Sequence, residues 1–255
     1  METIKRRAGT ILCLGLLLGL AWTVAVGVSL PNGLDPSEAC AQKVVGHDNP
    51  GHKIDVQTQW FPPRATCDFG DGDVKQYVST TRSTILSVIG VAVAAVLATG
   101  LILTVRRFFD DPGPIRPADG VDLRRRKLNH LMFGALDVLV VTAVLTFFNA
   151  AALIFGGIAG GLLCVVASIV ALSALGTTLD RHVGPLPSTT LDSRRRGTVA
   201  GATVFAVIFA ATAISGQLPF FRLWAAPLAA VTYVVVVAVQ WSRLPLPRRD
   251  HQPAN

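Results

Sequence analysis

The sequence predicts an all-α membrane protein with six transmembrane helices and both chain ends in the cytoplasm. A small extracytoplasmic domain, stapled by a disulfide and containing short β-strands, is expected between the first two helices. Three observations lead to this prediction. Hydrophobic residues make up 51% of the chain and charged residues 15%, against about 25% charged in a soluble domain. Six stretches approach the roughly 20 apolar residues that a spanning helix needs, and the basic residues gather between them.

These stretches divide the chain into spans and connections. The expected segments are a first span as an uncleaved signal-anchor in 1–30, the extracytoplasmic domain 31–82, a second span 83–105, a basic cytoplasmic loop 106–127, a two-span hairpin 128–175, a cytoplasmic loop 176–196, spans five and six in 197–241, and a cytoplasmic tail 242–255. We expect the tail to be disordered, because it is polar and contains proline.

The distribution of positive charge sets the expected orientation. Of the 23 Lys and Arg residues, 17 lie in the N-terminal segment, the two loops assigned to the cytoplasm and the tail. Positive charge marks the cytoplasmic side, so both ends are expected inside. The net charge of +7 does not indicate a nucleic-acid partner, because the basic clusters adjoin apolar runs. Arginine outnumbers lysine 18 to 5, a usage typical of GC-rich bacterial genomes, and we therefore expect a bacterial plasma (inner) membrane.

The first span resembles the start of a signal peptide, since basic residues precede an apolar run. That run covers 23 residues, from Ala8 to Leu30, whereas the apolar part of a signal peptide covers about 7–15. We therefore favour an anchor that is retained. Cleavage would leave five spans.

The extracytoplasmic domain carries two of the four cysteines, Cys40 and Cys67. A domain of this size builds little core, so a disulfide between them is expected in an oxidising compartment. It would close a loop worth about 3–4 kcal/mol in the chain-entropy model. Metal binding by these cysteines with His47 and His52 is the rival interpretation, but the spacing typical of metal ligands is missing. We predict no metal and no cofactor.

Two further patterns in this domain predict local structure. Residues 54–60 alternate apolar and polar side chains, which indicates a strand. The acids and glycines of 68–73 favour an acidic turn over a calcium loop, because the spacing and terminal glutamate of an EF-hand are missing.

The cytoplasmic loops carry the basic clusters Arg124–Lys127 and Arg194–Arg196. Each lies just before an apolar stretch, so orientation of the following span explains it. Specific binding of anionic lipid or of a partner is the alternative, since each basic residue near an anionic leaflet is worth about 1 kcal/mol.

The hairpin 128–175 is a 48-residue stretch whose only charged side chain is Asp137, and Asn149 marks its expected turn. Thr142, Thr146 and Asn149 share a polar stripe, which predicts hydrogen bonding between helices.

Asp137 is the sharpest candidate for chemistry. Placing a carboxylate inside the membrane costs roughly 2.5–3.5 kcal/mol on insertion scales. Asp137 must therefore face other helices, pair with another polar group or be protonated. Helical spacing places Gly134 beside it and His130 two turns away. The pair could relay protons or cations, or Asp137 could bond a hydroxyl on another span and fix packing. Both interpretations remain open.

The later spans contain packing and anchoring patterns. Gly156, Gly157, Gly160 and Gly161 form a small-residue seam of the kind that lets helix backbones approach closely. Trp224 and Trp241 lie 17 residues apart, about 25 Å along a helix, and are expected to anchor the last span at the two membrane interfaces.

No enzyme signature is found in the sequence: G-x-S-x-G beside a histidine, H-E-x-x-H, C-x-x-C and a P-loop are all missing. The leading hypothesis is a non-catalytic accessory protein or complex subunit, in contact with the bilayer and with a membrane-protein partner or a second copy. The alternative is a small proton- or cation-coupled transporter or channel using Asp137. An intramembrane enzyme is a third hypothesis, but catalysis usually needs several convergent polar groups.

Overall fold

The computed structural model describes residues 7–31, 36–44, 46, 54–70, 72–109, 112–218 and 222–243. The predicted disorder of the tail therefore lies outside the described residues, apart from its first two positions. The chain divides into two compact units. Unit 1 comprises Met1–Asp110 and Leu145–Ala167, and unit 2 comprises Asp111–Val144 and Ser168–Asn255.

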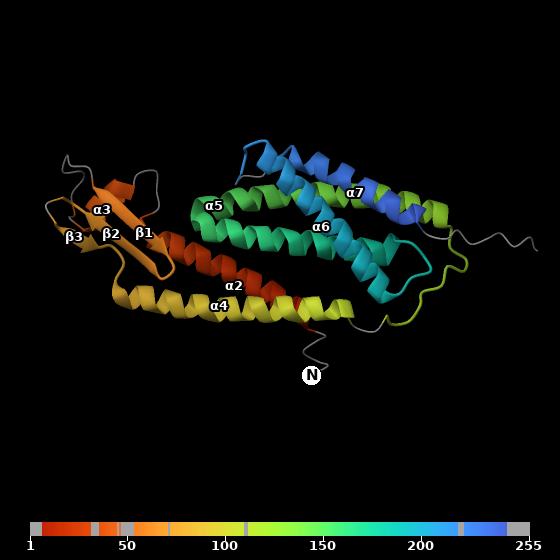
Figure 1. The fold of residues 1–255 in the computed structure, drawn as a ribbon, viewed down its shortest axis with the longest axis horizontal. Helices are drawn as coiled ribbons and strands as arrows, with labels where there is room; N and C mark the ends of the chain where they lie inside the picture. Colours follow the sequence, from red (N-terminus) through yellow and green to blue (C-terminus); the bar gives the residue numbers. More distant parts are fainter. Residues whose placement is uncertain are drawn as a thin grey trace, which may run out of the picture. The chain divides into compact units, whose positions relative to one another are not determined.

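Six helices in the described part of the chain are long and apolar enough to cross a membrane, which confirms the predicted fold class. They are α2 (Ala8–Ser29), α4 (Thr80–Arg106), the arms Leu123–Ile154 and Ala159–Val183 of α5 (Leu123–Val183), α6 (Thr190–Ile214) and α7 (Ala225–Ser242) (Figure 1). The short η1 (Arg107–Phe109) follows α4.

In unit 1, α2 and α4 pack side by side through glycines. The backbone of Leu12 occupies the space that a side chain at Gly100 would need, and the Trp22 ring occupies that beside Gly90. Leu12, early in α2, lies against Gly100, whereas Trp22, later in α2, lies against Gly90, which comes earlier in α4. The two helices are therefore antiparallel. The indole N–H of Trp22 also donates to the carbonyl of Leu86 at 2.7 Å.

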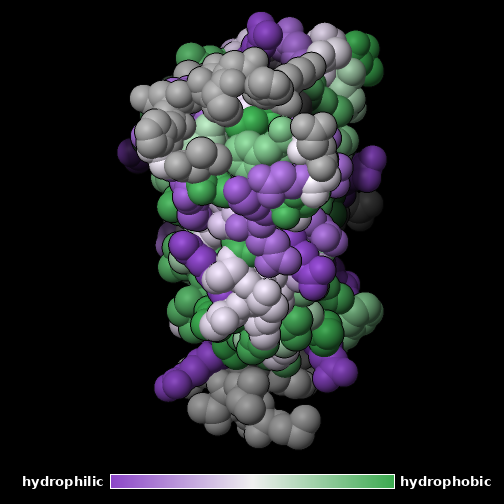
Figure 2. Space-filling model, turned by 90° about the vertical axis from the view of Figure 1, so that its left-hand side faces the viewer, coloured by the Kyte–Doolittle hydropathy of each residue, from purple (hydrophilic) through white to green (hydrophobic). Residues whose placement is uncertain are grey.

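The domain between α2 and α4 contains a helix and a small sheet. They are α3 (Pro36–Val44), β1 (Asp55–Trp60), β2 (Pro63–Asp68) and β3 (Val74–Gln76), and the sheet is antiparallel in the order β1-β2-β3. The strand predicted at 54–60 is confirmed. Hydrophilic residues form much of the middle of the face that Figure 2 shows.

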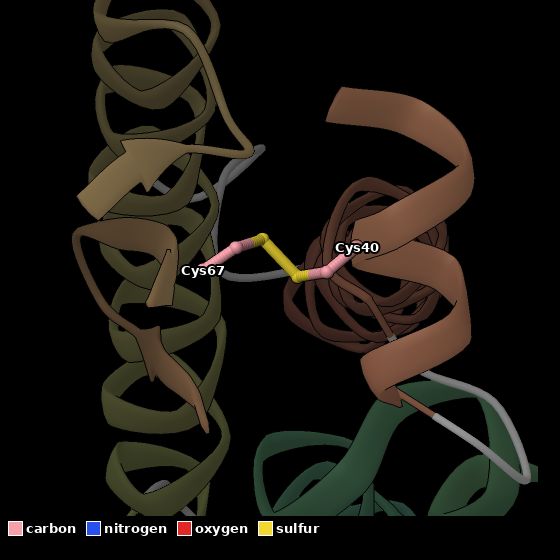
Figure 3. The surroundings of a disulfide bond; sticks show 2 residues. All are labelled: Cys40 and Cys67. Carbon is pink, nitrogen blue, oxygen red and sulfur yellow. A yellow bond between two sulfur atoms is a disulfide. The ribbon is translucent and has the colours of Figure 1, made fainter. Parts of the chain in front are cut away.

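The predicted disulfide joins Cys40 of α3 to Cys67 of β2, with a Cα–Cα distance of 6.0 Å (Figure 3). Both cysteines are fully buried in a small cluster with Ala41 and Ile54. The disulfide thus lies in one of the two small hydrophobic clusters to which this domain contributes.

The acidic turn joins β2 to β3. The Asp68 carboxylate accepts from the Gly70 N–H at 2.9 Å, and the Phe69 N–H donates to the Asp73 carbonyl at 3.1 Å. Gly70 and Gly72 have positive φ, which favours glycine. The turn prediction is therefore confirmed for these residues.

The hairpin α5 turns at Gly157, whose φ of 53° and ψ of −146° interrupt the helix. The prediction that it turns at Asn149 is wrong. Asn149 is helical and 2% exposed, because it lies on the inward stripe of the first arm. That stripe recurs every three or four residues as His130, Gly134, Val138, Thr142, Thr146 and Asn149.

The hairpin also begins earlier than the apolar stretch does. Asp122 caps the helix, its carboxylate accepting from the N–H groups of Arg124 and Arg125 at 2.9 and 3.1 Å. The basic cluster Arg124–Lys127 therefore lies in the first turns of α5 and not in the predicted loop 106–127. The reason is that the Asp122 cap stabilises a helix start before the apolar stretch begins.

In unit 2, α6 packs against both α5 and α7. Gly197 and Gly201 of α6 lie against the backbone of the second arm of α5, at Gly176 and Leu172. The start of α6 is fixed by a capping box, in which Thr189 and Asp192 bond to each other's backbone. Figure 1 shows α6 and α7 close together at the ends that the chain connects and diverging from there.

Candidate functional site

A buried group of polar side chains links α5 to α7 in unit 2. His130, 1% exposed, lies within 3.0 Å of the Tyr233 hydroxyl through Nε2. The Trp241 indole N–H donates to His130 Nδ1 at 3.1 Å. An indole can only donate, so Nδ1 carries no proton, and the Nε2–H of the neutral ring donates to Tyr233.

Gly134 makes this arrangement sterically feasible. It lies one turn after His130, and a Cβ there would overlap the Tyr233 ring. The helix that approaches Gly134 is therefore α7. Gly134 is buried while Asp137 is exposed, so the two do not share a face, contrary to the prediction from helical spacing.

A second polar group lies at the same end of unit 2. Arg196 of α6 donates through Nε and Nη2 to the Asp180 carboxylate of α5, at 3.2 and 3.1 Å. Asp180 is 2% exposed. The Gln240 amide donates to the Arg196 carbonyl at 3.1 Å, which ties α7 to this ion pair next to Trp241.

Two more arginines reach the segment that follows Asp180. Arg116 donates to the carbonyl of Arg181 and to the hydroxyls of Ser188 and Ser193. The Nε of Arg126 donates to the Gly184 carbonyl at 2.7 Å. The loop between α5 and α6 is thus held by hydrogen bonds from guanidinium groups to uncharged carbonyl and hydroxyl oxygens.

Asp137 is separate from these groups. Its side chain is exposed, and among the described residues none forms a hydrogen bond or ion pair with it. Its neighbours Phe133, Leu136 and Val140 are 58%, 57% and 51% exposed. The structure therefore does not bring the two intramembrane candidates together: His130 faces inward and Asp137 faces outward.

The glycines of the predicted seam occupy different environments in unit 1. Gly157 forms the turn. A Cβ at Gly160 or Gly161 would meet Ala152 or Leu153 of the opposite arm, and one at Gly156 would approach Thr23 of α2 at 3.3 Å. A common packing face for all four stays a prediction.

The two predicted anchors both use their indole N–H inside the protein. Trp224 donates to the Gln217 side chain at 2.9 Å, and Trp241 donates to His130. Both rings are half-buried. Their role at the membrane interface stays a prediction.

Tyr233 and Asp180 were not predicted as site residues, and Arg196 was predicted only as part of a basic cluster that orients the following span. Tyr233 lies in an apolar run and gives no signal by itself. Asp180 and Arg196 could have been paired, because they carry opposite charge and flank one short connection between adjacent spans.

The six apolar helices make the chain a multi-pass membrane protein. No family model, no curated protein and no solved structure matches it. Within the described ranges, no three His, Cys, Asp or Glu residues gather in a metal-binding arrangement. His47 and His52 of the rival metal hypothesis lie outside those ranges.

Proposed function

We propose that this protein is a non-catalytic subunit or accessory protein of a membrane complex. It would lie in a bacterial plasma membrane with residues 31–82 on the extracytoplasmic side. The observation that supports this proposal most directly is the outward position of Asp137 on an apolar face of α5.

A carboxylate among lipid tails is costly, by about 2.5–3.5 kcal/mol on insertion scales. A hydrogen-bond donor or cation from another helix offsets that cost. The six apolar stretches of this chain contain no Lys or Arg in their central turns. A membrane-protein partner with a basic or donor side chain at the matching depth would meet the requirement, and the exposed Phe133, Leu136 and Val140 would pack around the contact.

The inward polar groups support a non-catalytic role. Both ring nitrogens of His130 are engaged, with Tyr233 and Trp241, and both Asp180 oxygens accept from Arg196. Groups held in this way stabilise helix packing. An enzyme would need a nucleophile, acid or base free to meet a substrate.

A photo-crosslinking amino acid at Leu136 tests the proposal, with the same residue at Leu17 of α2 as a control of matched exposure (57% and 61%). Leu136 should give a discrete protein adduct in cell membranes, and Asp137→Leu should remove it. Equal adducts at both positions, adducts with lipid only, or an adduct insensitive to Asp137→Leu would count against a partner at this face.

Transport of protons or cations through Asp137 stays a prediction. It requires water to reach the carboxylate, although large apolar side chains flank it. A flux abolished in the Asp137→Asn variant, with the expression level unchanged, would favour transport over the accessory role.

A further inference from the structure

Three arginines from different elements converge at one end of unit 2. Arg116 precedes α5, Arg126 lies in its first arm, and Arg196 lies in α6. All three bind the segment 180–193, through the contacts already described for Arg181, Gly184 and Asp180. Their heads therefore surround the same short stretch of chain.

The carboxylates at this place do not balance the arginines. Asp180 is paired with Arg196, whose Nε and Nη2 both donate to its carboxylate. Asp192 accepts from the backbone N–H and hydroxyl of Thr189, at 2.9 and 2.7 Å, as part of the helix cap. Among the described residues no carboxylate forms an ion pair with Arg116 or Arg126, so even with Asp192 counted the group has an excess of positive charge.

Arg126 has unused donors. Its Nε bonds the Gly184 carbonyl, and its two terminal NH2 groups have no hydrogen-bond partner in the described part of the chain. The side chain is half-buried, and the bond from Nε holds the guanidinium group in place. A guanidinium fork presented in this way matches the oxygens of a phosphate group.

The position of the group suits a lipid. Arg126 lies two residues before Leu128, where the apolar stretch begins. The phosphate of a phospholipid lies at that depth, and basic pockets between spanning helices hold anionic headgroups. The neighbouring Arg124, Arg125 and Lys127 raise the local concentration of anionic lipid.

We propose that Arg116, Arg126 and Arg196 form a binding site for the phosphate group of an anionic phospholipid. The terminal NH2 groups of Arg126 donate to two phosphate oxygens, while Arg116 and Arg196 supply the surrounding positive charge. The acyl chains lie along the apolar part of α5. This site does not depend on the partner proposed for Asp137.

Native mass spectrometry of the full chain in detergent tests the site, with phosphatidylglycerol and phosphatidylcholine as probes. The parent protein should retain phosphatidylglycerol in preference to phosphatidylcholine. Arg126→Gln should weaken that retention about tenfold, as expected for one charge-assisted hydrogen-bond pair. Arg124→Gln removes the same charge from an exposed position. Detergent contains no anionic leaflet for that charge to attract, so retention should change much less than in Arg126→Gln.

Two controls accompany this experiment. One distinguishes a lipid from a free phosphate ion, and the other covers the case in which Arg126→Gln does not fold. Excess inorganic phosphate should not displace the lipid; displacement would overturn the lipid assignment in favour of a free anion. If Arg126→Gln fails to fold, Arg126→Lys keeps the charge without the fork and should still weaken retention. Equal losses in the Arg124 and Arg126 variants, or a parent without preference between the two lipids, would overturn the proposal.

Discussion

Gly134 controls whether α7 can reach the inward histidine of α5. Because the Tyr233 ring fills the space beside it, the hydroxyl comes within 3.0 Å of His130. The absence of one side chain therefore makes a buried hydrogen bond between two spans possible.

Gly134→Ala should lower the free energy of unfolding by about 1–3 kcal/mol, because the added methyl overlaps the Tyr233 ring in a packed core. Thermal unfolding of the purified protein in detergent measures the effect. Gly9→Ala is the matched control: the position is helical and nothing lies within 4 Å of a Cβ there. It should be neutral or slightly stabilising, so equal destabilisation by both changes would contradict the packing argument.

At the scale of elements, the turn of α5 depends on Gly157 and on Trp60. The φ of 53° and ψ of −146° at Gly157 belong to a region that side chains rarely adopt. The Trp60 ring of β1 occupies the space where a Cβ would project, with a ring carbon 2.5 Å from that position. Backbone strain and steric overlap therefore both exclude a side chain at this turn.

Gly157→Ala should cost about 2–4 kcal/mol of unfolding free energy, from about 1–3 of backbone strain and about 1 or more of overlap with Trp60. Chemical unfolding of the full chain measures it. In a Trp60→Ala background the cost should fall to the backbone part alone. An identical cost in both backgrounds would show that Trp60 plays no part.

The disulfide gives an independent prediction for the small domain. Replacing both Cys40 and Cys67 by Ser should lower the opening free energy of β1 and β2 by about 3–4 kcal/mol, since the closed loop spans 27 residues. Hydrogen exchange of the strand amides measures this change. Cys13→Ser, at an exposed free cysteine, should leave these amides unaffected.

The sequence was informative where one local pattern decides the outcome. Hydropathy fixed the six helices, alternation fixed the strand at 54–60, and a pair of cysteines in one small domain fixed the staple. It failed at Asn149 because a polar side chain inside an apolar stretch can mark either a turn or a buried stripe. Only the neighbouring helix decides between them.

The candidate site was less predictable for a related reason. Asp137 attracted attention as a lone charge, but nothing local indicates which way a helical side chain faces when both faces are apolar. The partnership of His130 with Tyr233 joins residues 103 apart in sequence. Such a contact depends on how α5 and α7 pack, and no spacing rule within either helix predicts it.

At the scale of the whole molecule, the orientation predicted from basic residues can be tested directly. In a chain with Cys13 and Cys164 replaced by Ala, Thr58→Cys should react with a membrane-impermeant maleimide in intact cells. Ile115→Cys, 70% exposed, should react only after the membrane is opened, because the basic loops remain in the cytoplasm. The reverse pattern would overturn both the orientation and the expectation of an oxidising compartment for residues 31–82.

The hairpin α5 belongs to both units: its tip, Leu145–Ala167, clusters with unit 1, while the rest of both arms clusters with unit 2. If the gene were divided after Asp110, the first fragment would lack the α5 tip that completes unit 1. The second fragment would carry that tip without the rest of unit 1, against which it packs. Neither fragment is expected to fold alone. The folded protein should form only when the two fragments are synthesised together and assemble in one bilayer.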